Sequence, residues 1–505
     1  MTASSRSAAP ADAEHAQAPV DPATVRTIIV GIMLAMFLSA LEQTIVAPAL
    51  PTIGRSLSDV ENLSWVVTAY LLSTTLATAL FGKLSDIYGR RALMLISIGV
   101  FVAGSIACAL APTIWALVAA RALQGLGGGG LLPLAQTVIA DILSPRERPQ
   151  VQSYSSVMFM SASILGPVLG GFLTDYVHWS MIFWINLPLG ALALLMTNRA
   201  LQRLPRHERP HRLDILGAVL MVGAAVALLL ALAWGGGFYG WGSAQILTLF
   251  GASAGLWLLF VWRLMSAPEP FIPLSMVRES VVGAVVTAGF FGIGTIIGLS
   301  IFMPLYLELA LGQSASASGL VLIAFMSGAT IGSLTAGRLL SRLDRYRRVP
   351  LVGLLLGIAV LAIFAIWPDR FSAPEVAALL VVGGLGMGTM YPTTTVLIQN
   401  AVPPYQVGTA TGTLNFFRQL GGAIVVAVFG AIVLGGLDTR SGGAVVLERL
   451  SGAPGTAVDF AMLFRWVFIA GAGFLASAFV AVLCVAERPL RGPAARPQSA
   501  PAAAE

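Results

Sequence analysis

Residues 63–111 read LSWVVTAYLLSTTLATALFGKLSDIYGRRALMLISIGVFVAGSIACALA, two long apolar runs separated by a short polar stretch. Each run has close to the roughly 20 apolar residues that a helix needs to cross the hydrocarbon core of a bilayer. The stretch between them holds Lys83, Asp86, Arg90 and Arg91. We therefore predict two transmembrane helices joined by a charged loop, and the same pattern recurs along most of the chain.

The composition of the whole chain favours a membrane protein. Of its 505 residues, 57% are hydrophobic and only 10% are charged, which is far from the usual mix of a soluble domain. The net charge is +6, but the basic residues are scattered through short loops, so we expect no nucleic-acid partner. The histidines and cysteines form no cluster with metal-ligand spacing, and we expect no metal.

Fourteen apolar runs predict fourteen transmembrane helices, and thus an all-α polytopic membrane protein embedded in the lipid bilayer. We place them at 27–49, 63–82, 92–111, 114–140, 151–174, 180–198, 215–235, 244–264, 281–309, 317–339, 349–367, 374–397, 407–435 and 461–485. Six spans lie in an amino-terminal bundle, 27–198, and six in a carboxy-terminal bundle, 281–485. The segment 199–280 holds a linker and two inserted spans, and the tails are 1–26 and 486–505.

The basic residues predict the orientation in the membrane, because cytoplasmic loops carry an excess of lysine and arginine. With the amino terminus inside, roughly 22 of the 29 lysines and arginines fall in cytoplasmic segments. The arginines that fall outside are Arg55, Arg370, Arg440 and Arg449. Both termini are then expected in the cytoplasm.

Charged side chains inside a span are costly and usually face a protein interior or a water-filled cavity. Glu42 lies roughly 13 Å from the outer end of its span, and Arg121 and Asn186 reach similar levels in theirs. We expect these three residues to share one polar site, where a carboxylate beside an arginine is a plausible proton switch. The alternative is a static ion pair that holds helices together.

Two further charged residues lie in the carboxy-terminal half. Arg418, with Asn415 one turn earlier, is either a contact for a ligand or a structural hydrogen-bond hub. Glu308 lies near the outer end of its span, where it is either a second acidic site or a surface acid that reaches the interface.

Asp86 lies in the predicted loop after the second span, with Arg90 and Arg91 just beyond it. Opposite charges at helix ends can hold the cytoplasmic ends of helices together, and their separation is one way to open access. Anchoring of the loop by positive charge alone would explain the arginines but not Asp86.

The fifth span contains a second candidate for a moving part. Gly166, Gly170 and Gly171 permit close helix contact, and Pro167 removes a backbone hydrogen bond, which predicts a bendable segment. Glycine-rich packing without any gating role would explain the pattern equally well.

Several function classes are disfavoured. Gly125, Gly127 and Gly130 spell GxGxxG, but they lie inside a predicted membrane helix and follow no strand, so we expect no dinucleotide. The chain has no GxxxxGK[ST] loop for ATP, and no nucleophile, metal site or acid pair gathers at one membrane face. We therefore expect no enzyme.

The chain also repeats internally. The basic segment GRLLSRLDRYRR, residues 337–348, stands after the tenth span where GKLSDIYGRR, residues 82–91, stands after the second. Paired halves are typical of transporters.

These motifs resemble the major facilitator superfamily, specifically its fourteen-span drug:proton antiporters, over nearly the whole chain. The segment LEQTIVAPALP, residues 41–51, is similar to a signature of the first span in that group. The matching positions are Gly82, Leu84, Asp86, Gly89, Arg90 and Arg91 after the second span; Arg121, Gln124 and Gly125 in the fourth; and Gly166, Pro167, Gly170 and Gly171 in the fifth.

The resemblance implies a major facilitator fold, with two six-helix bundles around a central cavity and the two inserted spans at the periphery. It makes the motif around Asp86 a conformational gate and assigns Arg121 to proton coupling, driven by the proton-motive force without a cofactor. Family members that take divalent cations carry an acid in the thirteenth span. Asn415 and Arg418 stand there in this chain, which disfavours dicationic drugs.

The implied function is multidrug efflux from a bacterial inner membrane, in which protons are exchanged for lipophilic or amphiphilic molecules and antibiotic resistance can follow. The alternative is a dedicated exporter of a single metabolite, antibiotic or lipid-like compound. Whether an accessory export partner carries the cargo further outward is left open.

Overall fold

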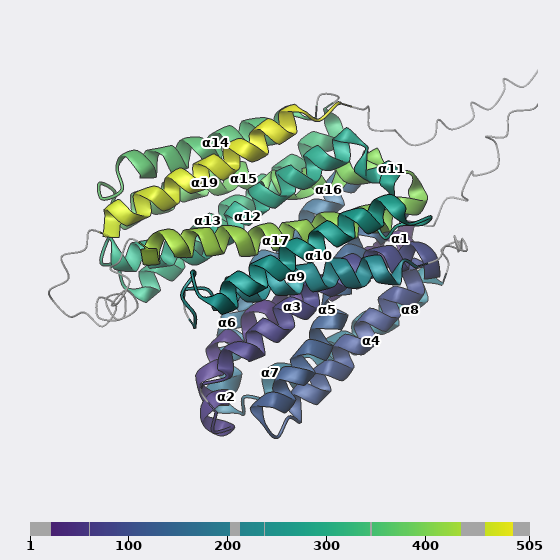
Figure 1. Ribbon diagram of the computed structural model, residues 1–505, viewed down its shortest axis with the longest axis horizontal. Coiled ribbons are helices and arrows are strands. Elements are labelled where there is room, and N and C mark those ends of the chain that lie inside the picture. The colour runs from purple at the N-terminus through teal and green to yellow at the C-terminus, as the bar shows by residue number, and fades with distance from the viewer. Residues whose placement is uncertain are drawn as a thin grey trace, which may run out of the picture.

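The computed structural model describes residues 22–59, 61–202, 213–236, 238–343, 346–435 and 460–487, which form a bundle of long helices (Figure 1). These residues contain no β-strand beyond one isolated bridge between Gly235 and Tyr239. The prediction of an all-α polytopic protein is confirmed. Most of the two predicted tails, much of the linker after residue 202, and Arg440 and Arg449 lie outside the described residues.

The amino-terminal half contains six long helices and three short elements. Their bounds are α1 Pro22–Ile45, η1 Ala47–Ala49, α2 Leu50–Ser56, α3 Leu63–Tyr88, α4 Arg90–Ala109, α5 Ile114–Ile142, α6 Arg148–Tyr176, α7 Met181–Trp184 and α8 Asn186–Leu201.

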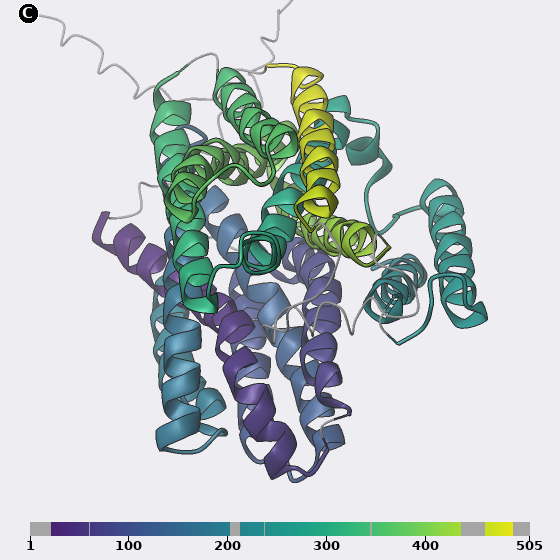
Figure 2. The same ribbon diagram turned by 90° about the vertical axis from the view of Figure 1, so that its left-hand side faces the viewer.

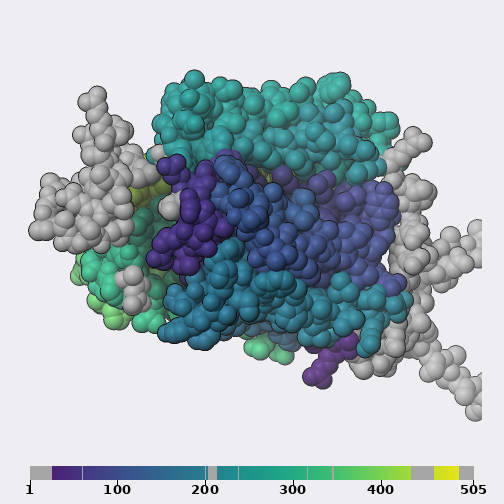
Figure 3. All heavy atoms as spheres, turned by 90° about the horizontal axis from the view of Figure 1, so that it is seen from below, coloured from purple at the N-terminus to yellow at the C-terminus, as the bar shows by residue number. Residues whose placement is uncertain are grey.

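Two helices, α9 Ile215–Trp234 and α10 Ala244–Ser266, follow and pack mainly against each other. They stand at one side of the bundle in Figure 2, and they form the teal band along one edge of the molecule in Figure 3. The carboxy-terminal half contains α11 Leu274–Val277, α12 Ser280–Leu309, α13 Ala315–Arg342, α14 Arg348–Ile366, α15 Ala373–Gly388, α16 Met390–Ala401, η2 Pro404–Gln406, α17 Val407–Gly435 and α19 Phe460–Leu483.

Within the described part of the chain, thirteen helical stretches are long and apolar enough to cross a membrane. The fourth predicted span, α5, is not among these thirteen although it is 29 residues long, because its run of glycines and its polar Arg121, Gln124 and Gln136 reduce its mean hydropathy. It packs along α3 on one side and α4 on the other, and most of its residues are buried. This span therefore faces protein more than lipid.

Three predicted spans are interrupted rather than continuous. The first breaks between α1 and α2, the sixth between α7 and α8, and the twelfth between α15 and α16. Pro51, Pro188 and Pro392 each lie one or two residues after the start of the second segment. Proline has no backbone N–H and crowds the preceding turn, so it removes a hydrogen bond of the helix and favours a break at these points.

The second predicted span, which is helix α3, continues further than predicted. It ends at Tyr88, so Asp86 lies in its last turn and the prediction that Asp86 occupies a loop is wrong. The reason is that a single residue, Gly89, connects α3 and α4 with a φ of +87°, a backbone conformation that glycine adopts without strain.

The glycine run of α5 brings three helices into backbone contact. A Cβ atom on Gly127 would lie 2.3 Å from the backbone nitrogen of Phe101 in α4, and one on Gly129 would lie 2.3 Å from the carbonyl oxygen of Thr74 in α3. The Ser97 hydroxyl donates to the carbonyl oxygen of Gly127 at 2.6 Å. The GxGxxG pattern therefore serves helix packing.

We expect the Gly127→Ala change to lower the free energy of unfolding by about 1–3 kcal/mol, because the new methyl group meets the α4 backbone. The matched control is Gly99→Ala, since a Cβ at Gly99 of α4 has no atom within 4 Å and alanine favours helix over glycine. Thermal unfolding of both purified variants in detergent measures the difference. Equal stability of the two variants would show that the backbone contact is dispensable.

Candidate functional site

Glu42 of α1 and Arg121 of α5 form an ion pair inside the amino-terminal half. Both side chains are almost completely buried, with 0% and 2% exposure. Asn186, at the start of α8, donates from Nδ2 to Glu42 Oε2 at 2.6 Å. The structure thus brings these three residues together, and we refer to Glu42, Arg121, Gln124 and Asn186 as the acidic cluster.

The acidic cluster is closed in by protein. Arg121 donates to Gln124 Oε1 at 2.7 Å and to the carbonyl oxygen of Val66 at 3.3 Å, and its guanidinium lies 4.1 Å from the centre of the Tyr70 ring. Gln124 donates in turn to the Ser105 hydroxyl at 2.8 Å. A proton on Glu42 would remove the charge that balances Arg121 and leave a buried cation without its partner.

A second polar cluster lies between the halves, around Arg418 of α17. The two terminal nitrogens of Arg418 donate to the side chain of Asn415 at 3.1 Å, the carbonyl oxygen of Tyr391 at 3.0 Å, and the hydroxyls of Thr394 at 2.5 Å and Thr395 at 2.9 Å. All of these acceptors are uncharged. We refer to Gln136, Tyr391, Thr394, Thr395, Asn415 and Arg418 as the central cluster.

The central cluster joins the two halves through Gln136 of α5. Asn415 donates to Gln136 Oε1 at 2.7 Å, and Gln136 Nε2 donates to the Tyr391 hydroxyl at 3.1 Å. The backbone carbonyl of Gln136 accepts from Gln152 and Gln399, each at 3.2 Å. The amino-terminal α5 therefore makes its polar contacts with α16 and α17 at this point.

The two clusters are distinct. Arg121 and Gln136 lie 15 residues apart on α5, or roughly 22 Å along the helix axis. Glu308 belongs to neither cluster: it is half-buried in the last turn of α12, whereas the part of α12 beside Arg418 is at Gly289. These two positions on α12 are roughly 28 Å apart.

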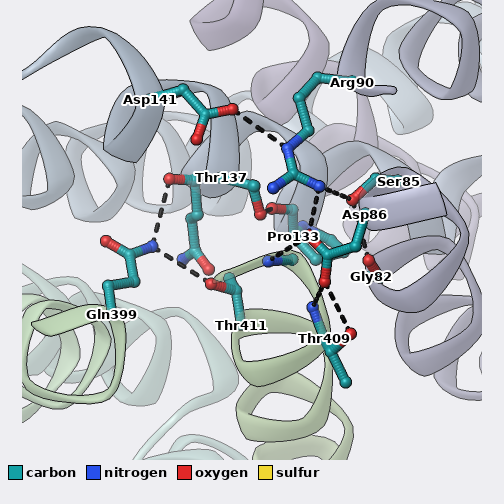
Figure 4. Close-up of polar contacts among 12 residues, drawn as sticks. Gly82, Ser85, Asp86, Arg90, Pro133, Thr137, Asp141, Gln399, Thr409 and Thr411 are labelled. Atoms are coloured by element: carbon teal, nitrogen blue, oxygen red, sulfur yellow. Dashed lines mark hydrogen bonds and ion pairs between the residues drawn. The ribbon is translucent and has the colours of Figure 1, made fainter. Parts of the chain in front are cut away.

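Asp86 contacts the start of α17 in the other half. Its carboxylate accepts hydrogen bonds from the backbone N–H groups of Gly408 at 3.0 Å and Thr409 at 2.6 Å, and from the Thr409 hydroxyl at 2.6 Å. Figure 4 shows Asp86 between Arg90 and Thr409. A carboxylate is well suited to the first turn of a helix, where N–H groups lack partners and the helix dipole is positive.

The two arginines after Asp86 have different partners. Arg90 donates to Asp86 at 2.5 Å and to Asp141 of α5 at 3.1 Å. Arg91 donates to Asn198 of α8 at 2.7 Å, so it binds within its own half. Both arginines thus bind within the amino-terminal half, and the role of Gly82, Asp86, Gly89, Arg90 and Arg91 as one gate stays a prediction.

Glycines allow α3 and α17 to approach closely beside Asp86. A Cβ on Gly82 would lie 2.6 Å from the carbonyl oxygen of Gly408 and 2.8 Å from the Cα of Gly412. A Cβ on Gly408 would lie 2.6 Å from an oxygen of Asp86. Any side chain at these positions would separate the helices.

We call the end of the molecule at which Asp86 lies the Asp86 end. Other contacts between the halves continue from this end toward the middle of the molecule. Ser156 of α6 and Ser333 of α13 are joined by a 2.8 Å hydrogen bond, and Gln419 of α17 exchanges hydrogen bonds with Thr75 and Thr78 of α3. The hydrogen bonds between described residues of the two halves extend from Asp86 to the level of Gln419, near the middle of α17. The molecule is closed at the Asp86 end.

The glycines of α6 pack against α1, with one exception. A Cβ on Gly166 would lie 2.0 Å from the Thr44 hydroxyl, and one on Gly170 would lie 2.2 Å from the carbonyl oxygen of Ile45. Gly171 has open space at the same position, so its predicted role in close contact is wrong. It follows Gly170 by one residue and therefore points away from α1. Pro167 lies inside the helix, as expected.

Sequence reasoning missed Gln136 and Tyr391. Gln136 carried a detectable signal, because an amide inside an apolar run needs a partner in the membrane just as Asn186 does. Tyr391 carried none, since its contact with α5 depends on how the two halves meet.

Comparison with known proteins gives the same superfamily as the motifs, while the assignment to its fourteen-span drug:proton antiporters stays a prediction. The model of the Major Facilitator Superfamily matches residues 32–203 and 195–426. A Mycobacterium tuberculosis protein described as an uncharacterized MFS-type transporter is 35% identical over 427 residues, which is 84% of this chain but 62% of that relative. The chain thus spans less than two thirds of that relative.

A Bacillus subtilis relative, the multidrug transporter protein MdtP, is 32% identical over 440 residues, covering 86% of this chain and 80% of that protein. The crystal structure of the human organic anion transporter MFSD10 aligns with a TM-score of 0.63 over 90% of this chain and 99% of that chain. Its sequence identity of 18% means that this likeness shows the fold alone. The family model, the identity to these relatives and the fold agree, and the chain belongs to the Major Facilitator Superfamily of multi-pass membrane proteins.

Proposed function

We propose that this protein is a proton-coupled antiporter that exports lipophilic or amphiphilic small molecules by alternating access. The observation that carries the proposal is the buried ion pair of Glu42 and Arg121. An ion pair at this depth in a membrane protein contributes little to stability by itself, because the cost of desolvation offsets most of the attraction. Its presence in an apolar half therefore supports a role in function.

The pair has the chemistry of a proton switch. Neutralising Glu42 leaves Arg121 with only neutral acceptors in a buried site, which favours a different arrangement of α1, α5 and α8 around it. A proton can shift a conformational equilibrium only if the two states bind it with different affinity. We propose that the acidic cluster differs in proton affinity between the two states, and the proposal requires no cofactor beyond the proton-motive force.

The packing supports movement of the halves as bodies. Two apolar cores lie wholly in the amino-terminal half and a third lies wholly in the carboxy-terminal half. Between the halves at the Asp86 end, hydrogen bonds and glycine-to-backbone approaches can separate without disturbing these three cores. A fourth core joins Ala79 of α3 to α9, α12 and α17, so a movement of the halves would have to part α3 from this core. Separation at this end would open the central cluster toward the Asp86 side.

We infer the cargo and the direction of transport from the names of relatives, and the location of the protein from its predicted orientation in the membrane. The Bacillus subtilis relatives are named a multidrug transporter and a multidrug resistance protein, which supports efflux of drugs by this chain. The excess of basic residues in the segments predicted as cytoplasmic supports a bacterial inner membrane with both termini inside. We assign no accessory partner.

A second candidate function is export of one dedicated metabolite, antibiotic or lipid-like compound. The central cluster favours it, because Arg418, Asn415 and Gln136 present directed hydrogen bonds, and buried polar groups discriminate strongly among ligands. The breadth of the cargo set separates the two candidates.

The proton-coupling proposal predicts that Glu42→Gln abolishes gradient-driven export while the protein remains folded. The physical reason is that glutamine keeps the size and hydrogen-bonding capacity of the side chain but cannot take up a proton. Reconstituted vesicles with an imposed pH gradient and a panel of one cationic, one neutral and one anionic dye measure the effect. We expect at least a tenfold loss for every dye that the parent protein moves.

Glu308→Gln is the matched control, since it removes an acid that belongs to neither cluster, and it is expected to transport normally. Glu42→Asp keeps a titratable group and should retain dependence on the gradient. Normal gradient-driven export by Glu42→Gln, or no movement of any dye by the folded parent, would contradict the proposal.

Alternating access predicts that Asp86→Asn opens the Asp86 end more often. An amide has one acceptor oxygen, so N–H groups at the start of α17 lose partners at a cost of about 1–3 kcal/mol, which raises the open population roughly 5- to 150-fold. Ser153 reports opening, because it is buried on α6 against Gly337 of α13. The measurement is the rate at which a water-soluble maleimide labels Ser153→Cys in a Cys484→Ser background, where Cys108 is buried.

The control is Arg91→Gln, which removes a charge from the same segment but contacts only its own half. Its labelling rate should match that of the parent. If Asp86→Asn labels no faster than Arg91→Gln, the contact between Asp86 and α17 does not hold this end closed.

A further inference from the structure

We propose that Arg418 binds the acidic group of the cargo, so that the molecules exported are aromatic or lipophilic organic anions. The inference rests on the proposed function, because it takes the region between the halves as the path of the cargo. It adds to that function the charge of the cargo and the residue that recognises it.

Arg418 is a buried cation without a counter-ion. Its side chain is 3% exposed, and it lies 11 residues into α17, roughly 16 Å from the Asp86 end. Within the described ranges, no carboxylate forms an ion pair with it, whereas Arg121 has Glu42 and Arg90 has Asp86 and Asp141. An uncompensated guanidinium at mid-membrane depth is costly and marks a site that an anion can complete.

The guanidinium also has a free donor. Its Nε atom is buried and has no hydrogen-bond partner, although both terminal nitrogens donate to neutral acceptors. Arginine presents its N–H groups in a planar fork that matches a carboxylate or sulfonate. The unused Nε–H is one prong of that fork.

The backbone of α12 lies on the same side of the guanidinium. Gly289 of α12 faces this part of Arg418: a Cβ at Gly289 would lie 3.0 Å from Cδ1 of Leu414, 3.4 Å from Cγ of Arg418 and 3.6 Å from its Nε. The absence of a side chain at Gly289 leaves the approach to Nε from α12 lined by backbone rather than by a competing group.

The surroundings fit the organic part of such a molecule. The Tyr391 ring lies 4.6 Å from the guanidinium carbon, and Phe159 of the other half packs edge-on against that ring with centroids 6.2 Å apart. The side-chain oxygens of Gln152 and Gln399 are buried without partners near Gln136, where they can accept hydrogen bonds from a hydroxyl or amine. Both halves therefore contribute to the same site.

A ligand bound here would also change the balance between the halves. Asn415 is shared, because it accepts from Arg418 and donates to Gln136 of α5. An anion that draws Arg418 away from Asn415 removes one of the bonds that hold the Asn415 side chain against Gln136 of the other half. Cargo binding and opening are thus linked at one side chain.

The test compares Arg418→Gln and Arg418→Lys with the parent protein. Equilibrium binding of two aromatic anions, fluorescein and 1-naphthoate, is measured on the purified full chain in detergent, with ethidium as the cation and Nile red as the neutral probe. We expect the parent to bind the anions more tightly than ethidium. Arg418→Gln should weaken anion binding about tenfold or more and change Nile red binding by less than about twofold. Arg418→Lys should retain part of the affinity.

The matched control is Arg465→Gln, which removes one positive charge from an exposed position on α19. It should bind all four probes as the parent does. Gradient-driven transport of the same probes in vesicles separates this inference from the proposed function: anion binding that depends on Arg418 without any gradient-driven movement supports the site and contradicts the antiporter.

Three outcomes would overturn the inference: preferential binding of ethidium by the parent, absence of anion binding by the folded parent, or an equal loss of all probes in Arg418→Gln. The last result would make Arg418 a structural hub. If Arg418→Gln does not fold, the test uses Arg418→Lys and a Gly289→Val variant. The valine places a side chain beside Nε of Arg418. Unchanged anion binding in Gly289→Val would count against the site.

Discussion

The contact of the α5 backbone with α3 and α4 is the constraint on which both polar clusters depend. Glycines at 125, 127 and 129 let three helices meet without side chains between them, which fixes the height and rotation of α5. That helix carries Arg121 toward one end and Gln136 toward the other. A small displacement of α5 would therefore alter the partner of Glu42 and the partner of Asn415 together. The acidic cluster and the central cluster are therefore connected through the same helix, α5.

Charge compensation in the membrane explains how the remaining polar residues are arranged. Arg121 and Arg90 have carboxylates, and the acid at Asp214 has Arg263 beside it at 3.0 Å. Arg418 instead has a shell of amides, hydroxyls and a carbonyl from α16 and α17. Such a shell satisfies the hydrogen-bond donors but leaves the net charge in place. The central cluster is thus electrostatically incomplete, while the acidic cluster is complete in the conformation described.

The sequence predicted the helices well because long apolar runs carry a strong signal, and it predicted the meeting of Glu42, Arg121 and Asn186 because depth in the membrane follows from residue counting. It could not predict rotation about a helix axis, which is why the close contact expected at Gly171 is absent. Nor could it find the partner of Asp86, since Thr409 is 323 residues away in the chain. Contacts between the halves depend on how two bodies dock, and no local pattern records that. The functional roles of the site residues stay predictions.

The contact between Asp86 and α17 has a consequence for hydration. While the Asp86 end is closed, the carboxylate and the N–H groups of Gly408 and Thr409 satisfy one another, and the glycine surfaces beside them touch with little room for solvent. When the helices part, each of these groups must find a water molecule instead. Opening at this end is therefore a wetting step that takes up water from the adjoining compartment. Solutes that are excluded from protein surfaces, such as sucrose, oppose such a step, so we expect the conformational equilibrium to respond to osmotic conditions in addition to the proposed response to protons.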